Sequence, residues 1–101
     1  KDVILPYVIP DVQPVWHIFA IRSKRRDELE KYLNEKGIGT NKHYPIPMHR
    51  QGCYANLGIQ QGELPIAEEI SATELSLPMF YGMTDEQVKY VIDAINSFGK
   101  K

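Results

Sequence analysis

The chain has 101 residues, of which 43% are hydrophobic and 25% charged, the proportions of one soluble globular domain. Its formal net charge of −1 gives no electrostatic basis for binding nucleic acid or an anionic membrane, which excludes both as expected partners. Cys53 is the only cysteine, which excludes an internal disulfide and favours a cytoplasmic location, and no apolar run approaches the roughly 18 residues that a membrane-spanning helix needs.

The first part of the chain contains three evenly spaced prolines, Pro6, Pro10 and Pro14. Because proline cannot continue a helix, we expect residues 1–14 to be an extended connector that arrives from a preceding domain. Residues 15–22 are rich in β-branched and aromatic residues and are predicted to form a strand. Both faces of this strand are apolar, which indicates that both are covered. One small domain cannot easily supply two covers, so we expect another domain or subunit to provide one.

A helix and a second strand are predicted next. Residues 25–36 are expected to form an amphipathic helix, because Leu29 and Leu33 fall on one stripe at helical spacing. Residues 38–44 are predicted to form a short strand, which must end at Pro45 because proline cannot continue a central ladder.

The second half of the chain begins with a predicted loop. Residues 48–63 contain three glycines and are expected to be irregular, with one short helical turn at residues 54–57. Pro65 suits the first position of a helix that runs to about Glu74. Residues 75–77 are predicted to form a third short strand.

The last helix has the clearest pattern in the sequence. Thr84 and Gln87 are spaced as a capping box ahead of five apolar residues at helical spacing: Val88, Val91, Ile92, Ile95 and Phe98. The order of elements predicts an α+β fold, with a three-stranded antiparallel sheet and helices on one face.

The candidate site is a polar cluster over residues 40–49, at the end of the predicted second strand. His43 and Tyr44 can hydrogen-bond hydroxyl groups and offer an apolar ring face, as a wall that binds sugars requires. Lys42 and His49 border them and are weaker candidates. An ordinary turn, in which Tyr44 packs and His43 caps a carbonyl, explains the same residues and stays open.

Other kinds of site find less support. His43, His49 and Cys53 match no common zinc spacing, so no metal site is predicted. No glycine-rich nucleotide fingerprint or phosphate loop is present. Lys42 lacks an evident pocket that would desolvate it, as a lysine that forms a Schiff base requires.

The motifs of the chain, taken together and in order, resemble those of the DegT/DnrJ/EryC1/StrS family of aminotransferases, which aminate keto-sugars attached to nucleotides. The matching pieces cover nearly the whole chain: Val15–Phe19, Arg26–Leu29, Tyr32–Leu33, Gly37–Thr40, His43–Pro47 with His49 and Gln51, Leu64–Pro65, Ala67–Glu68, Leu75–Met79, Gly82–Thr84 and Gln87–Val88. Tyr81 departs from the pattern, since relatives often carry a proline there.

The resemblance implies that residues 15–101 are the C-terminal small domain of a fold-type I enzyme that depends on pyridoxal phosphate. The large domain of such an enzyme carries the catalytic lysine and the cofactor, so we expect no catalytic residue, no bound cofactor and no activity in this chain alone. The resemblance also implies a homodimer, an amino-acid donor such as glutamate, and sugar contacts by His43 and Tyr44. The pattern of His43–Pro47 with His49 and Gln51 most resembles that of family members acting on 3-keto-6-deoxy sugars of dTDP.

A second hypothesis is a free-standing module that binds a small molecule through the loop of His43 and Tyr44, or that mediates an interaction, without catalysis. A complete module of this kind should not leave the second apolar face of the first strand uncovered.

Overall fold

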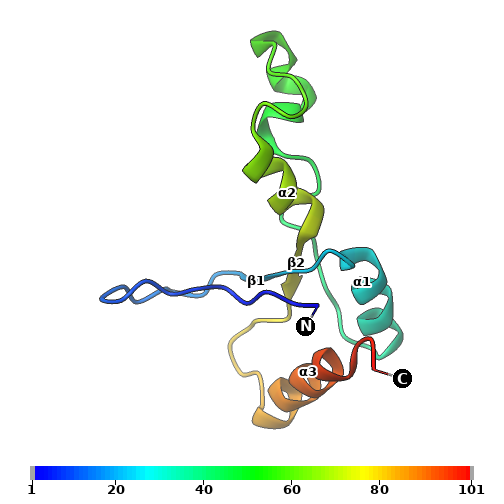
Figure 1. Ribbon diagram of the computed structural model, residues 1–101. Helices are drawn as coiled ribbons and strands as arrows, with labels where there is room; N and C mark the ends of the chain where they lie inside the picture. The colour runs from blue at the N-terminus through cyan, green and yellow to red at the C-terminus, as the bar shows by residue number, and fades with distance from the viewer. Residues whose placement is uncertain (1, 101) are drawn as a thin grey trace.

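The computed structural model describes residues 2–100 and shows an α+β chain built on a two-stranded antiparallel sheet (Figure 1). Strand β1 spans Phe19–Arg22 and strand β2 spans Glu74–Leu77, with Ile21 opposite Leu75. The α-helices are α1 (Arg26–Glu35), α2 (Pro65–Thr73) and α3 (Asp85–Ser97), and two short 3-10 helices are η1 (Met48–Arg50) and η2 (Gly52–Leu57).

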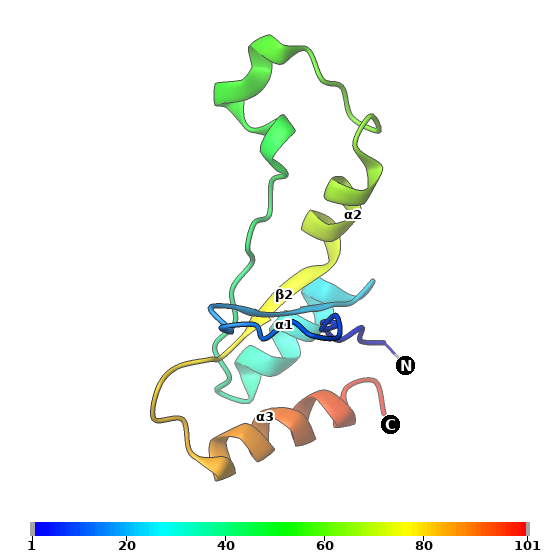
Figure 2. The same cartoon turned by 90° about the vertical axis from the view of Figure 1, so that its left-hand side faces the viewer.

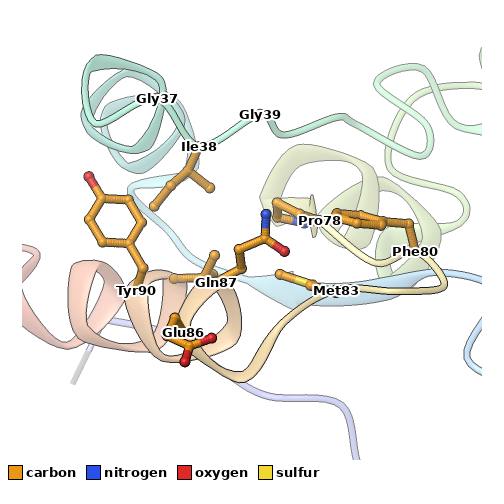
Figure 3. A pocket seen from close by; sticks show the side chains of 10 residues that line it. Gly37, Ile38, Gly39, Pro78, Phe80, Met83, Glu86, Gln87 and Tyr90 are labelled. Atoms are coloured by element: carbon orange, nitrogen blue, oxygen red, sulfur yellow. The ribbon is translucent and has the colours of Figure 1, made fainter.

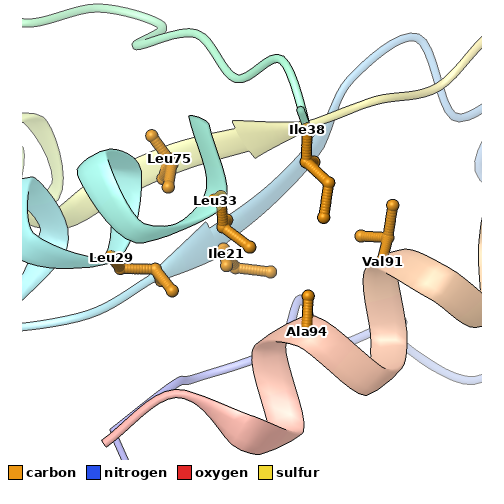
Figure 4. Packing of buried hydrophobic residues seen from close by; sticks show 7 residues of the cluster. All are labelled: Ile21, Leu29, Leu33, Ile38, Leu75, Val91 and Ala94. Atoms are coloured by element: carbon orange, nitrogen blue, oxygen red, sulfur yellow. The ribbon is translucent and has the colours of Figure 1, made fainter. Parts of the chain in front are cut away.

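The core lies where α1 and α3 pack together on the strands (Figure 4). Leu29 and Leu33 are one helical turn apart on α1 and are both fully buried, as the periodicity predicts. Burial of each such side chain contributes roughly 1.5–3 kcal/mol to folding. The remaining core side chains come from both strands, from the segment after α1 and from α3: Ile21, Ile38, Leu75, Val91 and Ala94. By contrast, α2 lies outside this core. Its C-terminal end joins the start of β2, and the helix extends away from α1 and α3 (Figure 2).

Helix α3 begins as its sequence predicts. The Gln87 N–H donates to Oγ1 of Thr84 at 3.2 Å, and the Thr84 N–H donates to Oε1 of Gln87 at 2.9 Å. This reciprocal pair satisfies two backbone donors that a helix start leaves free, and it confirms the predicted capping box.

The prediction of a strand over residues 38–44 is wrong: the described part of the chain has two strands rather than three. Only Asn41 pairs with the sheet, through one isolated bridge to Ser76. The next two backbone donors are diverted to side chains: the Lys42 N–H donates to Oδ1 of Asn41 at 2.8 Å, and the His43 N–H donates to Oε2 of Glu74 at 2.7 Å. Side-chain acceptors have therefore replaced the ladder.

The first strand is shorter than predicted, because β1 begins at Phe19 rather than at residue 15. Trp16 has a φ of 49°, in the left-handed region that breaks an extended path for a bulky residue. Residues 2–18 instead form an extended arm that runs out, turns at Pro10 and Asp11, and returns to β1 (Figure 1). The Ile4 N–H donates to the Arg22 carbonyl at 2.8 Å, which joins the base of the arm to the sheet edge.

Candidate functional site

The segment that carries His43 is held along the free side of β2. Backbone hydrogen bonds run both ways between Asn41 and Ser76, with N–O distances of 3.2 and 2.7 Å. This bridge places the loop that follows it beside the polar face of β2. Successive side chains of a strand point to opposite faces, so Glu74 and Ser76 lie on the face opposite the core that Leu75 enters.

His43 meets both polar residues of β2. Nδ1 of its ring lies 2.8 Å from Oγ of Ser76, and its backbone N–H donates to Glu74. The Ser76 hydroxyl in turn donates to the other carboxylate oxygen of Glu74. Glu74 and Ser76 are 3% and 5% exposed, so these two side chains are shielded from water, whereas His43 is half-buried.

A hollow of about 300 Å³ opens beside this cluster. Polar groups from three segments face it, and apolar side chains complete the wall. Its lining residues are His17, Ile18, Gly39, Thr40, Asn41, His43, Ser76, Leu77, Pro78 and Met79. Such a mixture of apolar wall and few convergent polar groups is typical of sites for small molecules.

Tyr44 stands at the edge of the cluster and is 65% exposed. Its ring lies perpendicular to that of His43, with 5.3 Å between the centroids, and the peptide bond between the two residues is cis. The ring therefore has free surface for a ligand and is not the packed side chain of the turn hypothesis.

Lys42 points away from the hollow. Its ammonium lies 2.8 Å from Oε2 of Glu30 and 3.2 Å from Oδ1 of Asp27, both on α1. These contacts, that with Glu30 first, raise the pKa of Lys42. A lysine that forms a Schiff base must lose its proton, so Lys42 does not suit pyridoxal phosphate.

His49 also lies elsewhere, in η1, where it is buried. Its Nε2 is 2.9 Å from Oε1 of Glu68, and the Gly62 N–H donates to the same carboxylate at 2.8 Å. The geometry thus joins η1, the loop before α2 and α2 itself. Of the four candidate residues, His43 alone lines the hollow. Tyr44 stands next to it with its ring edge-on to that of His43, and Lys42 and His49 lie elsewhere.

A second hollow of about 410 Å³ lies between the end of α1 and the start of α3 (Figure 3). Its wall is mostly apolar, with Ile38, Phe80, Met83 and Tyr90 around it. The Tyr90 hydroxyl donates to the Lys36 carbonyl at 2.8 Å, so this side chain links α3 to the end of α1.

Within residues 2–100, no group of three or more acidic, histidine or cysteine side chains is arranged to hold a metal ion. Among the described helices, none has the length and apolar content needed to cross a membrane.

Comparison with known proteins decides the family. The model of the DegT/DnrJ/EryC1/StrS aminotransferase family matches residues 3–96. The chain belongs to this family. Its similarity to a dTDP-3-amino-3,4,6-trideoxy-alpha-D-glucose transaminase of Streptomyces venezuelae is 41% identity over 96% of the chain and 26% of that protein. A dTDP-3-amino-3,6-dideoxy-alpha-D-galactopyranose transaminase of Aneurinibacillus thermoaerophilus is 42% identical over 94% of the chain and 26% of its own length.

Solved structures of relatives share the fold. The crystal structure of S. venezuelae DesV, in complex with a ketimine intermediate, superposes with a TM-score of 0.95 and 40% identity over 100% of this chain and 27% of that one. NtdA of Bacillus subtilis, with its bound cofactor PMP, gives a TM-score of 0.76 and 28% identity over 93% and 22% of the two chains. The chain therefore spans about a quarter of the length of these relatives, and the resemblance inferred from its motifs is confirmed.

Proposed function

We propose that this chain is the C-terminal small domain of a nucleotide-sugar aminotransferase, and that it forms part of the wall that holds the sugar. The reaction would transfer an amino group from an amino acid, glutamate in our proposal, to a nucleotide-linked keto-deoxysugar. The observation that carries the proposal is the hollow beside β2, which His43 lines, in a chain that belongs to an aminotransferase family. The exposed ring of Tyr44 contacts that of His43 next to this hollow.

The keto-sugar we favour is a 3-keto-6-deoxyhexose linked to dTDP. Two relatives with about 41–42% identity are named for 3-amino deoxysugars of dTDP, which supports amination at C3. The residues at the hollow suit such a ligand, because imidazole and amide groups can bind ring hydroxyls while Ile18, Leu77 and Met79 offer surface to a deoxygenated carbon.

Pyridoxal phosphate would supply the electron sink for the transfer, held by the rest of the polypeptide. In that arrangement the preceding large domain, or its copy in a homodimer, covers the apolar arm of residues 2–18. The arm supports this partner, since Tyr7 and Val15 are 80% and 93% exposed here. A cytoplasmic location accords with the single cysteine, Cys53.

An absorbance spectrum of the full-length protein tests the proposal, with the 101-residue chain as the control. We expect a cofactor band in the full-length protein that borohydride abolishes, and no such band in the control. Absence of the band from the full-length protein would overturn the aminotransferase proposal and favour a module that binds its ligand without catalysis.

A further inference from the structure

We propose that Ser76 and Glu74 are positioning residues that fix the tautomer of His43, so that its Nε2 faces the hollow as a hydrogen-bond acceptor. The inference deepens the proposed function and rests on it for the identity of the ligand. Its structural basis is the chain of contacts from the buried carboxylate of Glu74, through the Ser76 hydroxyl, to the imidazole ring of His43.

The direction of this chain follows from the carboxylate. An ionised Glu74 has only acceptors, and it receives the His43 backbone N–H on Oε2 at 2.7 Å and the Ser76 hydroxyl on Oε1. Ser76 has a single hydrogen, which it has then already donated. Its oxygen can therefore only accept from the His43 ring, which requires that Nδ1 carries the proton.

The other ring nitrogen is left with its lone pair. In this tautomer Nε2 accepts, and the Asn41 amide is a donor within reach, with its Nδ2 3.4 Å away. This distance is long for a hydrogen bond, so the lone pair is only weakly satisfied. Asn41 and His43 both line the hollow, where a ligand hydroxyl can supply a better donor.

The arrangement gives the site a preference. A hydroxyl can donate to Nε2, whereas a carbonyl or ether oxygen at the same place has no hydrogen to give. The relay thereby selects a sugar that carries a hydroxyl opposite His43, and it does so through two residues that are 97% and 95% buried and that do not need to touch the ligand.

Glu74→Gln tests the relay with almost no change in shape. The introduced amide can still accept the His43 backbone N–H with its oxygen, but its NH2 group must donate to Ser76. The Ser76 hydroxyl is then free to donate to Nδ1 of His43, so the ring proton moves to Nε2. We expect long-range nitrogen–proton NMR spectra of histidine-labelled full-length protein to show Nδ1 protonated in the wild type and Nε2 protonated in Glu74→Gln.

The matched control is Glu63→Gln, on the exposed loop before α2, which should leave the wild-type pattern unchanged. The His43 signals are assigned by their loss in His43→Gln. If Glu74→Gln does not fold, Ser76→Ala serves instead: it removes the acceptor for Nδ1–H, and we expect the Nε2-protonated form to appear. A wild-type His43 protonated on Nε2, or an unchanged pattern in the folded variant, would overturn the inference.

Steady-state kinetics give the second measurement. In Glu74→Gln we expect the KM for the dTDP-linked 3-keto-6-deoxyhexose to rise about five- to tenfold, as for the loss of one hydrogen bond, with a smaller change in kcat. An unchanged KM together with a reversed tautomer would refute the role in sugar selection. Because the NMR result needs neither sugar nor turnover, failure of the relay and failure of the proposed function are distinguishable.

Discussion

At the scale of single residues, Glu68 shows how one carboxylate can hold separate segments together. It contacts Nε2 of His49 in η1 and accepts the Gly62 N–H from the loop before α2. These hydrogen bonds, that with His49 first, keep the pKa of Glu68 below its usual range. A carboxyl whose pKa is lower in the folded state stabilises the fold above its unfolded pKa of about 4.3, and this contribution is lost as the pH falls through the lowered value.

We therefore expect Glu68→Gln to lower the Tm of the full-length protein at pH 7 and to leave less of a difference from the wild type as the pH approaches 3. Thermal denaturation across this pH range measures both effects. Glu63→Gln, on the exposed loop that precedes α2, is the control and should follow the wild-type curve. A Glu68→Gln protein with an unchanged Tm at pH 7 would show that the contact does not stabilise the fold.

The sequence was informative about part of the site. A polar loop after a predicted strand indicated His43 and Tyr44. The structure places His43 in the wall of the hollow and the ring of Tyr44 edge-on to that of His43, and their contact with sugar stays a prediction. The sequence could not indicate Glu74 and Ser76, because they lie 31 and 33 residues from His43 and meet it only through the register of β2. The sequence did hold one signal for them. Glu74 and Ser76 alternate with Leu75 and Leu77, so in a strand the two polar side chains must share the face opposite the core.

Lys42 and His49 show the opposite case. Both are neighbours of His43 in sequence, yet the chain directs Lys42 to carboxylates on α1 and buries His49 against Glu68 on α2. Distance along an irregular segment says little about which way its side chains point. Their assignment to the sugar site is therefore no longer supported by proximity.

At the scale of elements, the capping box of α3 gives a direct prediction. Thr84→Ala removes the acceptor for the Gln87 N–H, so we expect it to lower the free energy of unfolding by about 1 kcal/mol. Ser97→Ala, at the other end of α3, removes a hydroxyl that donates to the Asp93 carbonyl and caps nothing. Urea denaturation should place this control within about 0.5 kcal/mol of the wild type. Equal effects of the two substitutions would contradict the role of the cap.

The helices were more predictable than the strands. Spacing of Leu29 and Leu33, the proline at the start of α2 and the capping box of α3 act within a few residues, so local pattern was enough. A strand exists only through its partner. Residues 38–44 have suitable composition, but the side chains of Asn41 and Glu74 take the backbone donors that a ladder would use.

At the scale of the whole molecule, the arm of residues 2–18 is the largest departure from a closed globule (Figure 1). Its apolar side chains are mostly exposed, with Tyr7 and Val15 the most so. We expect the isolated 101-residue chain to self-associate at micromolar concentration, and Tyr7→Ser combined with Val15→Ser to reduce this association. Sedimentation velocity measures both, with Tyr81→Ser as a control for an exposed aromatic outside the arm. A monomeric wild-type chain would argue against the need for a covering partner.

We propose that the chain contributes a sugar wall and not the cofactor chemistry. Single-turnover measurements on the two half-reactions of the full-length protein test this role most directly. With glutamate, we expect His43→Ala and Tyr44→Phe to react within about twofold of the wild type. With the dTDP-linked 3-keto-6-deoxyhexose, we expect the efficiency to fall about tenfold or more for His43→Ala, and less for Tyr44→Phe. Equal losses in the two half-reactions would contradict this role and give the loop a purely structural one.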